Sequence, residues 1–299
     1  MGKKLHKIRA AEYFARLARM RVTCYLSRAR GNRLAARIAC FPGDDIGNHI
    51  IAHGWYEDLL LEAIFSQFLD GDAARFRGGI AVDVGANIGN HTLWFSRRFA
   101  QVLSFEPNPI CIKLFEANML MNGTDNVRLF PLGLSDHDTE LMFYANQHEN
   151  LGRSGVTPAL AASATHSFPI KVARGDSLLT NEVVGERTIC LIKLDIEGHE
   201  HAALTGLRDT LLAHRPLVLF ESHHAIGHSG SHAIVAQLAE WGYAHIYVVQ
   251  TNRSPYENPI LKFAYRLLKG LTLSLHKVDR PPDQSYSLII AATKPQCES

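Results

Sequence analysis

The chain has 299 residues, of which 46% are hydrophobic and 20% are charged. This composition is ordinary for a globular protein and excludes a disordered or fibrous chain. The formal net charge is only +2, and no run of about 18 or more apolar residues occurs, so the sequence predicts no transmembrane helix. The five cysteines are scattered without a Cys-x-x-Cys pair, which favours reduced thiols and a cytoplasmic protein.

The first 40 residues are strongly basic. They carry eleven Lys/Arg and one Glu, a local charge of +10, which leaves −8 on the rest of the chain. The residues that share one helical face are Tyr13, Leu17, Met20 and Cys24. We therefore expect a basic amphipathic helix, in an N-terminal extension (residues 1–50) ahead of one large domain (residues 51–299). Such a helix either packs on the domain, which is the more ordinary arrangement, or makes peripheral contact with the inner membrane surface.

Strand and helix patterns alternate along the rest of the chain. In the first half, the expected elements are a helix at 55–69, a strand at 80–84, a helix at 90–99, a strand at 102–105, a helix at 110–122 and a strand at 127–134. Strands at 141–145 and 168–172 then flank a loop at 150–167. The second half should contain a strand at 189–195, a helix at 200–213, a strand at 216–220, a helix at 231–241, a strand at 243–249, a helical insertion at about 252–283 and a strand at 287–291. This alternation predicts an α/β fold with a doubly wound, mostly parallel sheet.

The segment from Ile80 to Glu106 carries the clearest functional signal. An apolar strand runs into a turn that contains Gly85 and Gly89, and a helix and a second strand follow. Open α/β sheets bind ligands at the carboxyl ends of their strands, where glycines let the backbone approach the ligand closely. Glu106 follows Gly85 at the distance expected for a carboxylate that binds ribose hydroxyls. The segment therefore predicts a nucleoside-containing cofactor.

The glycine spacing excludes a dinucleotide. The dinucleotide motif is G-x-G-x-x-G, but Asn87 and Asn90 stand where its second and third glycines would be. The sequence Asp83-x-Gly85-x-Asn87-x-Gly89 instead resembles motif I of class I S-adenosylmethionine (SAM) methyltransferases, in which this turn holds the amino-acid half of the cofactor. The resemblance implies SAM as the cofactor and the class I methyltransferase fold.

Four further blocks occur in order after Val-Asp-Val-Gly-Ala-Asn-Ile-Gly. They are Phe105–Pro109, Gly133–Asp136, Lys193–Glu200 and Leu219–His223. Together, over about residues 54–225, they are similar to the FkbM-type methyltransferase family. That resemblance implies methyl transfer, usually to a hydroxyl oxygen of a saccharide or natural product, and suggests that Tyr56 and Glu57 help to close the site. N-methylation of a small molecule is an alternative, and nucleic-acid binding through the basic N-terminus is another, which the acidic body disfavours.

Cofactor-binding residues are expected at three strand ends. Asp83 should fix the turn and reach the ammonium group of SAM, Glu106 should bind the ribose, and Gly133–Ser135 should read the adenine edge. The full predicted set is Asp83, Gly85, Ala86, Asn87, Gly89, Glu106, Pro107, Asn108, Leu134 and Ser135. Two of these have a structural alternative, turn capping for Asp83 and helix capping for Asn108.

Acidic and histidine side chains follow the next two strands. The candidate catalytic residues are Asp195, Glu197, His199, Glu221 and His223. One imidazole or carboxylate among them would serve as the general base for the acceptor. On an extended backbone only one of Asp195 and Glu197 would face the crevice, and members of this group, with Glu200, could instead cap the following helix. A divalent metal site built on Asp195, Glu221 and His223 is conceivable but not favoured, because the nearby histidines are irregularly spaced. The sequence does not indicate an oligomeric state.

Overall fold

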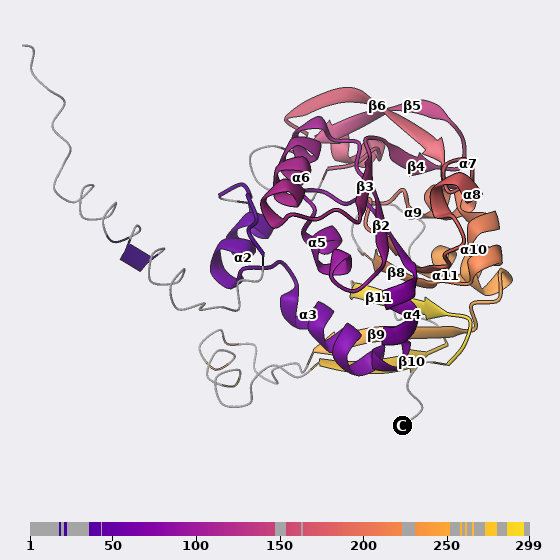
Figure 1. Cartoon of the computed structure of the whole chain (residues 1–299). Helices are drawn as coiled ribbons and strands as arrows, with labels where there is room; N and C mark the ends of the chain where they lie inside the picture. Colours follow the sequence, from indigo (N-terminus) through magenta and orange to yellow (C-terminus); the bar gives the residue numbers. More distant parts are fainter. Residues whose placement is uncertain are drawn as a thin grey trace, which may run out of the picture.

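Eight strands form the central sheet of the described part of the chain, in the order β10-β9-β11-β8-β7-β1-β2-β3 (Figure 1). Strands β3, β2, β1, β7 and β8 run parallel, whereas β11 is antiparallel to both β8 and β9, and β10 is antiparallel to β9. Their bounds are β1 Ile80–Val84, β2 Gln101–Phe105, β3 Val127–Phe130, β7 Ile189–Leu194, β8 Leu217–Ser222, β9 His245–Thr251, β10 Leu273–Val278 and β11 Tyr286–Ala292. The expected doubly wound, mostly parallel sheet is confirmed.

The structure is a computed structural model. It describes residues 18, 21–22, 36–42, 44–146, 154–162, 164–222, 231–251, 258, 261, 265, 273–279 and 286–295. The apolar face expected at Tyr13, Leu17, Met20 and Cys24 lies outside these residues, as does His223. The division of the chain at residue 50 stays a prediction.

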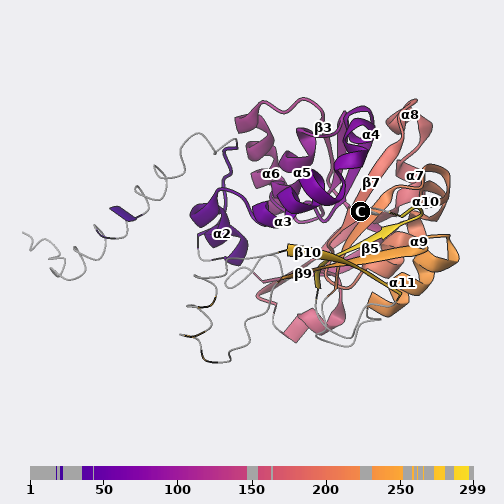
Figure 2. The same ribbon diagram turned by 90° about the horizontal axis from the view of Figure 1, so that it is seen from below.

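Helices cover both faces of the sheet (Figures 1 and 2). Their bounds are α2 Asp45–His53, α3 Asp58–Ala63, α4 Ala73–Gly78, α5 Asn90–Ser96, α6 Pro109–Asn122, α7 Gly175–Leu178, α8 Asn181–Val184, α9 Glu200–Gly206, α10 Arg208–His214 and α11 Ser231–Glu240. Helices α3–α6 bury an aromatic-rich core against one face, and α7–α11 bury a mostly aliphatic core against the other. The central strands β1 and β7 are buried along their whole length, which is why they are mostly apolar, with Asp83 and Lys193 as buried charged exceptions.

A second, three-stranded sheet stands above the carboxyl ends of the parallel strands (Figure 1). It consists of β4 (Gly133–Ser135), β5 (Thr139–Ala145) and β6 (His166–Arg174), with β6 in the middle. The single strand expected at 127–134 is therefore wrong. Pro131 lacks the N–H that a continuous ladder needs, and the chain turns there and enters the second sheet as β4.

Three other regions differ from the expectations in the type or division of their elements. The helix expected at 200–213 is two helices that meet at Leu207. The helix expected at 55–69 begins at Asp58 and ends in a π-helix, Ile64–Phe68. Residues 273–278, expected within a helical insertion, form β10 instead, because Leu273 and Leu275 alternate with polar residues and pair with β9.

A strap formed by residues 36–42 leads into α2 and lies along α6. Asn118 and Asn122, one turn apart on α6, bind the strap through their amide groups. Asn118 accepts from the Ala39 N–H at 2.7 Å and donates to the Ala39 carbonyl at 3.1 Å. Asn122 makes the same pair of bonds with Arg37, at 2.9 and 2.7 Å. The end of the basic segment is thus hydrogen-bonded to the domain. None of the helices in the described ranges is long and apolar enough to cross a membrane.

Candidate active site

The glycine turn after β1 has the backbone conformation that its sequence predicts. Gly85, Asn87 and Gly89 all have positive φ, of 78°, 50° and 87°, a region in which glycine is strongly favoured and asparagine is tolerated. A Cβ atom on Gly85 would lie 2.0 Å from the carbonyl oxygen of Asp195. Only glycine therefore fits at this position, and the ends of β1 and β7 approach each other through it.

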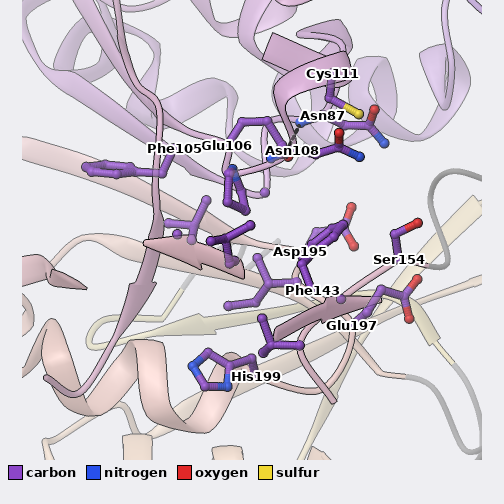
Figure 3. A pocket seen from close by; sticks show the side chains of 18 of the residues that line it. Asn87, Phe105, Glu106, Asn108, Cys111, Phe143, Ser154, Asp195, Glu197 and His199 are labelled. Atoms are coloured by element: carbon purple, nitrogen blue, oxygen red, sulfur yellow. Dashed lines mark hydrogen bonds between the residues drawn. The ribbon is translucent and has the colours of Figure 1, made fainter. Parts of the chain in front are cut away.

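The carboxylate of Glu106 lies directly beneath this turn. It accepts hydrogen bonds from the backbone N–H of Asn87 and from that of Asn108, each at 2.8 Å (Figure 3). Glu106 is 6% exposed. This burial raises its pKa to about 7, although the two N–H donors act in the opposite direction. Each carboxylate oxygen keeps lone-pair capacity for another donor, as binding of ribose hydroxyls requires.

A cavity of about 290 Å³ opens beside Glu106, a size at the low end for ligand pockets. In Figure 3, Asn87, Glu106 and Asn108 lie above the carboxylates of Asp195 and Glu197, and His199 lies below them. The lining residues that the sequence predicted are Gly85, Asn87, Glu106, Pro107, Asn108, Leu134, Asp195, Glu197, His199 and Glu221. The cavity therefore brings together the predicted cofactor residues and the predicted acceptor residues.

Of the predicted residues that the structure describes, four do not line the cavity: Asp83, Ala86, Gly89 and Ser135. Asp83 is fully buried in β1, and its carboxylate accepts a hydrogen bond from Thr92 at 2.6 Å and lies 3.5 Å from the Lys193 ammonium. Asp83 is thus held in the core by α5 and β7 and does not form part of the cavity wall. Gly89 is the residue before α5 and packs against Phe115 and Met119 of α6.

Asn108 combines two roles. It lines the cavity, and its side chain accepts from the Ile110 N–H at 3.0 Å. This bond caps α6, which begins with Pro109. Asn108 therefore caps α6, which is its structural alternative, and also forms part of the cavity wall.

The expectation that only one of Asp195 and Glu197 faces the crevice is wrong, because residues two apart on an extended strand share a face. The junction after β7 is also not extended. β7 ends at Leu194, and Glu197 has a φ of 49°. The Thr157 hydroxyl donates to the Glu197 carbonyl at 3.0 Å. Both carboxylates line the same cavity. A non-glycine residue in this conformation is uncommon and requires support from its surroundings.

The two residues after Gly198 have different surroundings. Glu200 accepts from the Ile196 and Gly198 N–H groups at 3.3 and 3.1 Å, so it caps the junction, and burial raises its pKa. His199 makes a 3.0 Å hydrogen bond between Nε2 and the Ser135 hydroxyl, and burial lowers its pKa. His199 is thus a largely neutral imidazole held against β4.

Tyr56 completes the cavity on the side of Glu221. Its backbone is held by the side chain of Asn90, the first residue of α5, which accepts from the Tyr56 N–H and donates to its carbonyl, each at 3.0 Å. Burial, together with the neighbouring carboxylates of Glu57 and Glu221, raises the pKa of Tyr56. Tyr56 therefore stays protonated and presents a hydroxyl donor.

Several lining residues were not predicted from the sequence. They are Asp45, Ile46, Val84, Phe105, Cys111, Phe143, Ser154, Gly155, Val156, Ile170, Val172 and Ile196. The second sheet supplies the apolar wall at Phe143, Ile170 and Val172, and α2 supplies Asp45 and Ile46. The sequence offered one signal for this wall. Side chains alternate between the two faces of β6, so Ile170 and Val172 lie on the same face.

The described residues contain no group of three or more His, Cys, Asp or Glu side chains that could hold a metal ion. The metal site that the sequence analysis did not favour would require His223, which is outside the described ranges.

Two features define a class I methyltransferase fold. The first is the strand order, in which the antiparallel β11 lies between β8 and β9. The second is the glycine turn and Glu106 at the ends of β1 and β2. Residues 83–244 match the family described as the Methyltransferase FkbM domain. Because this match covers more than half of the chain, the protein belongs to the FkbM methyltransferase domain family.

Two curated relatives resemble the same part of the chain. "Methyltransferase 1" of Beauveria bassiana is 31% identical over 146 residues, which are 43% of this chain and 58% of the relative. "Hexuronic acid methyltransferase AglP" of Haloferax volcanii is 33% identical over 138 residues, 43% of this chain and 50% of the relative. The chain thus spans about half the length of the curated relatives it matches. A solved structure of methyltransferase FkbM from Methylobacillus flagellatus KT is 15% identical, with a TM-score of 0.41, over 72% of this chain and 44% of that chain.

Proposed function

We propose that the protein binds SAM and transfers its methyl group to a hydroxyl oxygen of a saccharide or of a similar hydroxylated metabolite. The observation that carries the proposal is the Glu106 carboxylate, held by two backbone N–H groups under a glycine turn and facing a cavity. This arrangement suits a ribose, and the backbone of Gly85 and Asn87 suits the amino-acid half of SAM. The apolar wall at Leu134, Ile170 and Val172 suits the flat face of a purine.

The cavity separates cofactor binding from acceptor chemistry. SAM, when bound, supplies a methyl group that is already activated by the sulfonium, so the protein needs to align the acceptor and accept its proton. Asp195 and Glu221, at the ends of adjacent strands, are the described candidates for that base. His223 stays a candidate from the sequence alone. The protonated Tyr56 hydroxyl is positioned to donate to an oxygen of the acceptor.

The acceptor class is supported by similarity alone. One relative is named as a hexuronic acid methyltransferase, which favours a saccharide for this chain. Methylation of an amine is the competing proposal, because a carboxylate base near the transferred methyl group would also serve an ammonium acceptor. Nucleic acid is not a favoured partner, and we propose no metal cofactor.

Two experiments test the proposal. Calorimetry should give binding of S-adenosylhomocysteine (SAH) and none of NAD, and the reverse result would refute the cofactor assignment. The enzyme should then transfer labelled methyl from SAM into a saccharide fraction of cell extract. Label in a methyl ether resists mild alkali, whereas a methyl ester on a hexuronate carboxylate is released by it. Alkali-stable label in a fraction that cation exchange retains would instead identify N-methylation.

A further inference from the structure

A row of buried polar side chains crosses the apolar core beneath the cofactor turn. The Thr92 hydroxyl lies 2.9 Å from that of Ser104 on β2 and donates to Asp83 on β1 at 2.6 Å. Asp83 in turn pairs with Lys193 on β7 at 3.5 Å. Lys193 continues the row, with its ammonium 3.2 Å from the Asp195 carboxylate. The row therefore runs from the core of the sheet to the cavity.

Strand register explains this row. Asp83 pairs with Ser104 on one side and with Lys193 on the other, so the three side chains stand at the same level of the sheet. Asp195 follows Lys193 by two residues and therefore leaves the strand end in the same direction. The Lys193 ammonium also lies 3.5 Å from the carbonyl oxygen of Gly85. The Lys193 side chain thus contacts both the cofactor turn, at Gly85, and the Asp195 carboxylate.

Burial of the charged Lys193 side chain carries a large free-energy cost. It is 4% exposed, and an unpaired ammonium at such a depth would be strongly destabilising. Burial alone would lower its pKa, but the carboxylates of Asp195 and Asp83 outweigh burial and raise it. Lys193 therefore remains charged. A cation that only neutralised Asp83 would not need to reach Asp195 and Gly85 as well.

We propose that Lys193 is a positioning residue, which holds the Gly85 carbonyl and the Asp195 carboxylate in one fixed arrangement and keeps Asp195 ionised beside the transferred methyl group. The inference rests on the proposed function, because it places Asp195 next to the sulfonium of SAM. It assigns a role to a residue that touches neither cavity nor ligand. The competing explanation is that Lys193 serves only to neutralise the buried Asp83.

Substitutions can separate these two roles. Lys193→Met alone leaves the buried Asp83 charge without its cation and risks unfolding the protein. The double variant Asp83→Asn/Lys193→Met removes both charges. The matched control is Asp83→Asn, which keeps the Lys193–Asp195 pair. Both variants lose the Asp83 charge, so they differ only at Lys193. Glu221, Tyr56 and Glu200, the other ionisable groups near Asp195, are the same in both.

The measurement is the ratio of the dissociation constants of SAM and SAH between pH 5.5 and 8, obtained by calorimetry. The two ligands differ by a methyl group and its positive charge, so the ratio reports the charge beside the sulfonium, and the titration of Glu106 cancels. We expect a constant ratio for the wild type and for Asp83→Asn. In the double variant, SAM should weaken relative to SAH by about tenfold at the acidic end, because Asp195 without its cation takes up a proton there.

A folded double variant whose ratio stays constant, and whose SAH affinity equals that of Asp83→Asn, would overturn the positioning role. If the double variant does not fold, Asp83→Asn/Lys193→Gln is measured in its place, with the same expected result. Failure of the wild type to bind SAH at all would refute the proposed function rather than the role of Lys193. Asp195→Asn serves as a reference, since SAM should bind weakly relative to SAH at every pH, which gives a high ratio throughout.

Discussion

The two halves of the cavity are built by different means. On the cofactor side, the backbone forms the site: the glycines of the turn set its path, and two main-chain N–H groups hold Glu106. On the proposed acceptor side, side chains form the supporting contacts: Lys193, which pairs with the distant Asp83, also pairs with Asp195, and the Thr157 hydroxyl donates to the main-chain carbonyl of the left-handed Glu197. The cofactor side is therefore specified by local sequence, whereas the acceptor side depends on residues distant in the chain. Substitutions should affect the two sides differently.

The largest effect is expected at the acceptor side. Asp195→Asn and Glu221→Gln should leave the melting temperature close to that of the wild type, because both residues line the cavity rather than the core. Turnover should fall by about 10²–10⁴-fold for whichever residue is the general base. Steady-state rates with saturating SAM, together with thermal unfolding, provide the measurement. Early melting with a normal specific activity would return that residue to a structural role.

Glu106→Gln should act on the cofactor side alone. A charge-assisted hydrogen bond contributes roughly 1.5–3 kcal/mol, so SAH should bind about 10–150-fold more weakly. The maximal rate at saturating SAM should change far less. Calorimetry with SAH gives the affinity, and Asp195→Asn is the control that should retain it. Equal losses of SAH affinity in both variants would contradict the division of the cavity into two sides.

Cofactor binding should also depend on pH through Glu106. Its pKa of about 7 in the free protein should fall when ribose hydroxyls donate to the carboxylate, so binding favours the ionised form. SAH affinity is then highest above pH 7 and decreases below it, by up to about tenfold per pH unit. Glu106→Gln should remove this dependence. A profile that is the same in the variant would assign the titration to another group.

The strap provides a test of stability. Asn118 is fully buried and binds both the strap and the Ile88 carbonyl of the cofactor turn. Asn118→Ala should lower the free energy of unfolding by about 1–3 kcal/mol, because it leaves buried backbone groups without partners. Asn122→Ala, at an exposed site with similar bonds, is the matched control and should have a smaller effect. Equal effects in chemical denaturation would contradict this explanation.

The smallest effect on catalysis is expected from the basic extension. Removing residues 1–35 keeps the strap and should leave SAH affinity unchanged. We expect the extension to pack on the domain, so the truncation should melt earlier. Salt-sensitive co-sedimentation of the intact protein with anionic vesicles, lost in a truncated protein of unchanged stability, would instead assign the extension to a membrane surface.

The sequence predicted the geometry of the glycine turn for a physical reason. Gly85, Gly89 and Glu106 act through the backbone of one βαβ unit, so their spacing along the chain carries the geometry. β1 was placed with its exact ends because four of its five residues are apolar. Asp83 was placed at the turn but expected to reach the ligand, and nothing local shows that Lys193, 110 residues later in the numbering, is its partner.

The acceptor side and the sheet edges were predicted less well because long-range contacts decide them. Glu197 was expected on extended backbone, but its conformation depends on Thr157 in the insertion. Tyr56 entered only through the family resemblance, and its support comes from Asn90. At the edge of the sheet, the residues before 273 have a helix-like apolar spacing, which led to the expected helical insertion. Residues 273–278 nevertheless pair with β9 and form a strand.

The three-stranded sheet has a consequence for how this enzyme can diversify. Its strands pair only with one another in the described part of the chain, yet they supply Phe143, Ile170 and Val172 to the cavity wall. A change of length or sequence within residues 139–174 can therefore reshape that wall while every register of the eight-stranded sheet stays as it is. Because Ile170 and Val172 are also proposed to face the purine of SAM, such a change should alter cofactor binding as well as the rest of the cavity. This stretch can therefore vary the ligand-binding wall without altering the sheet that carries the cofactor turn.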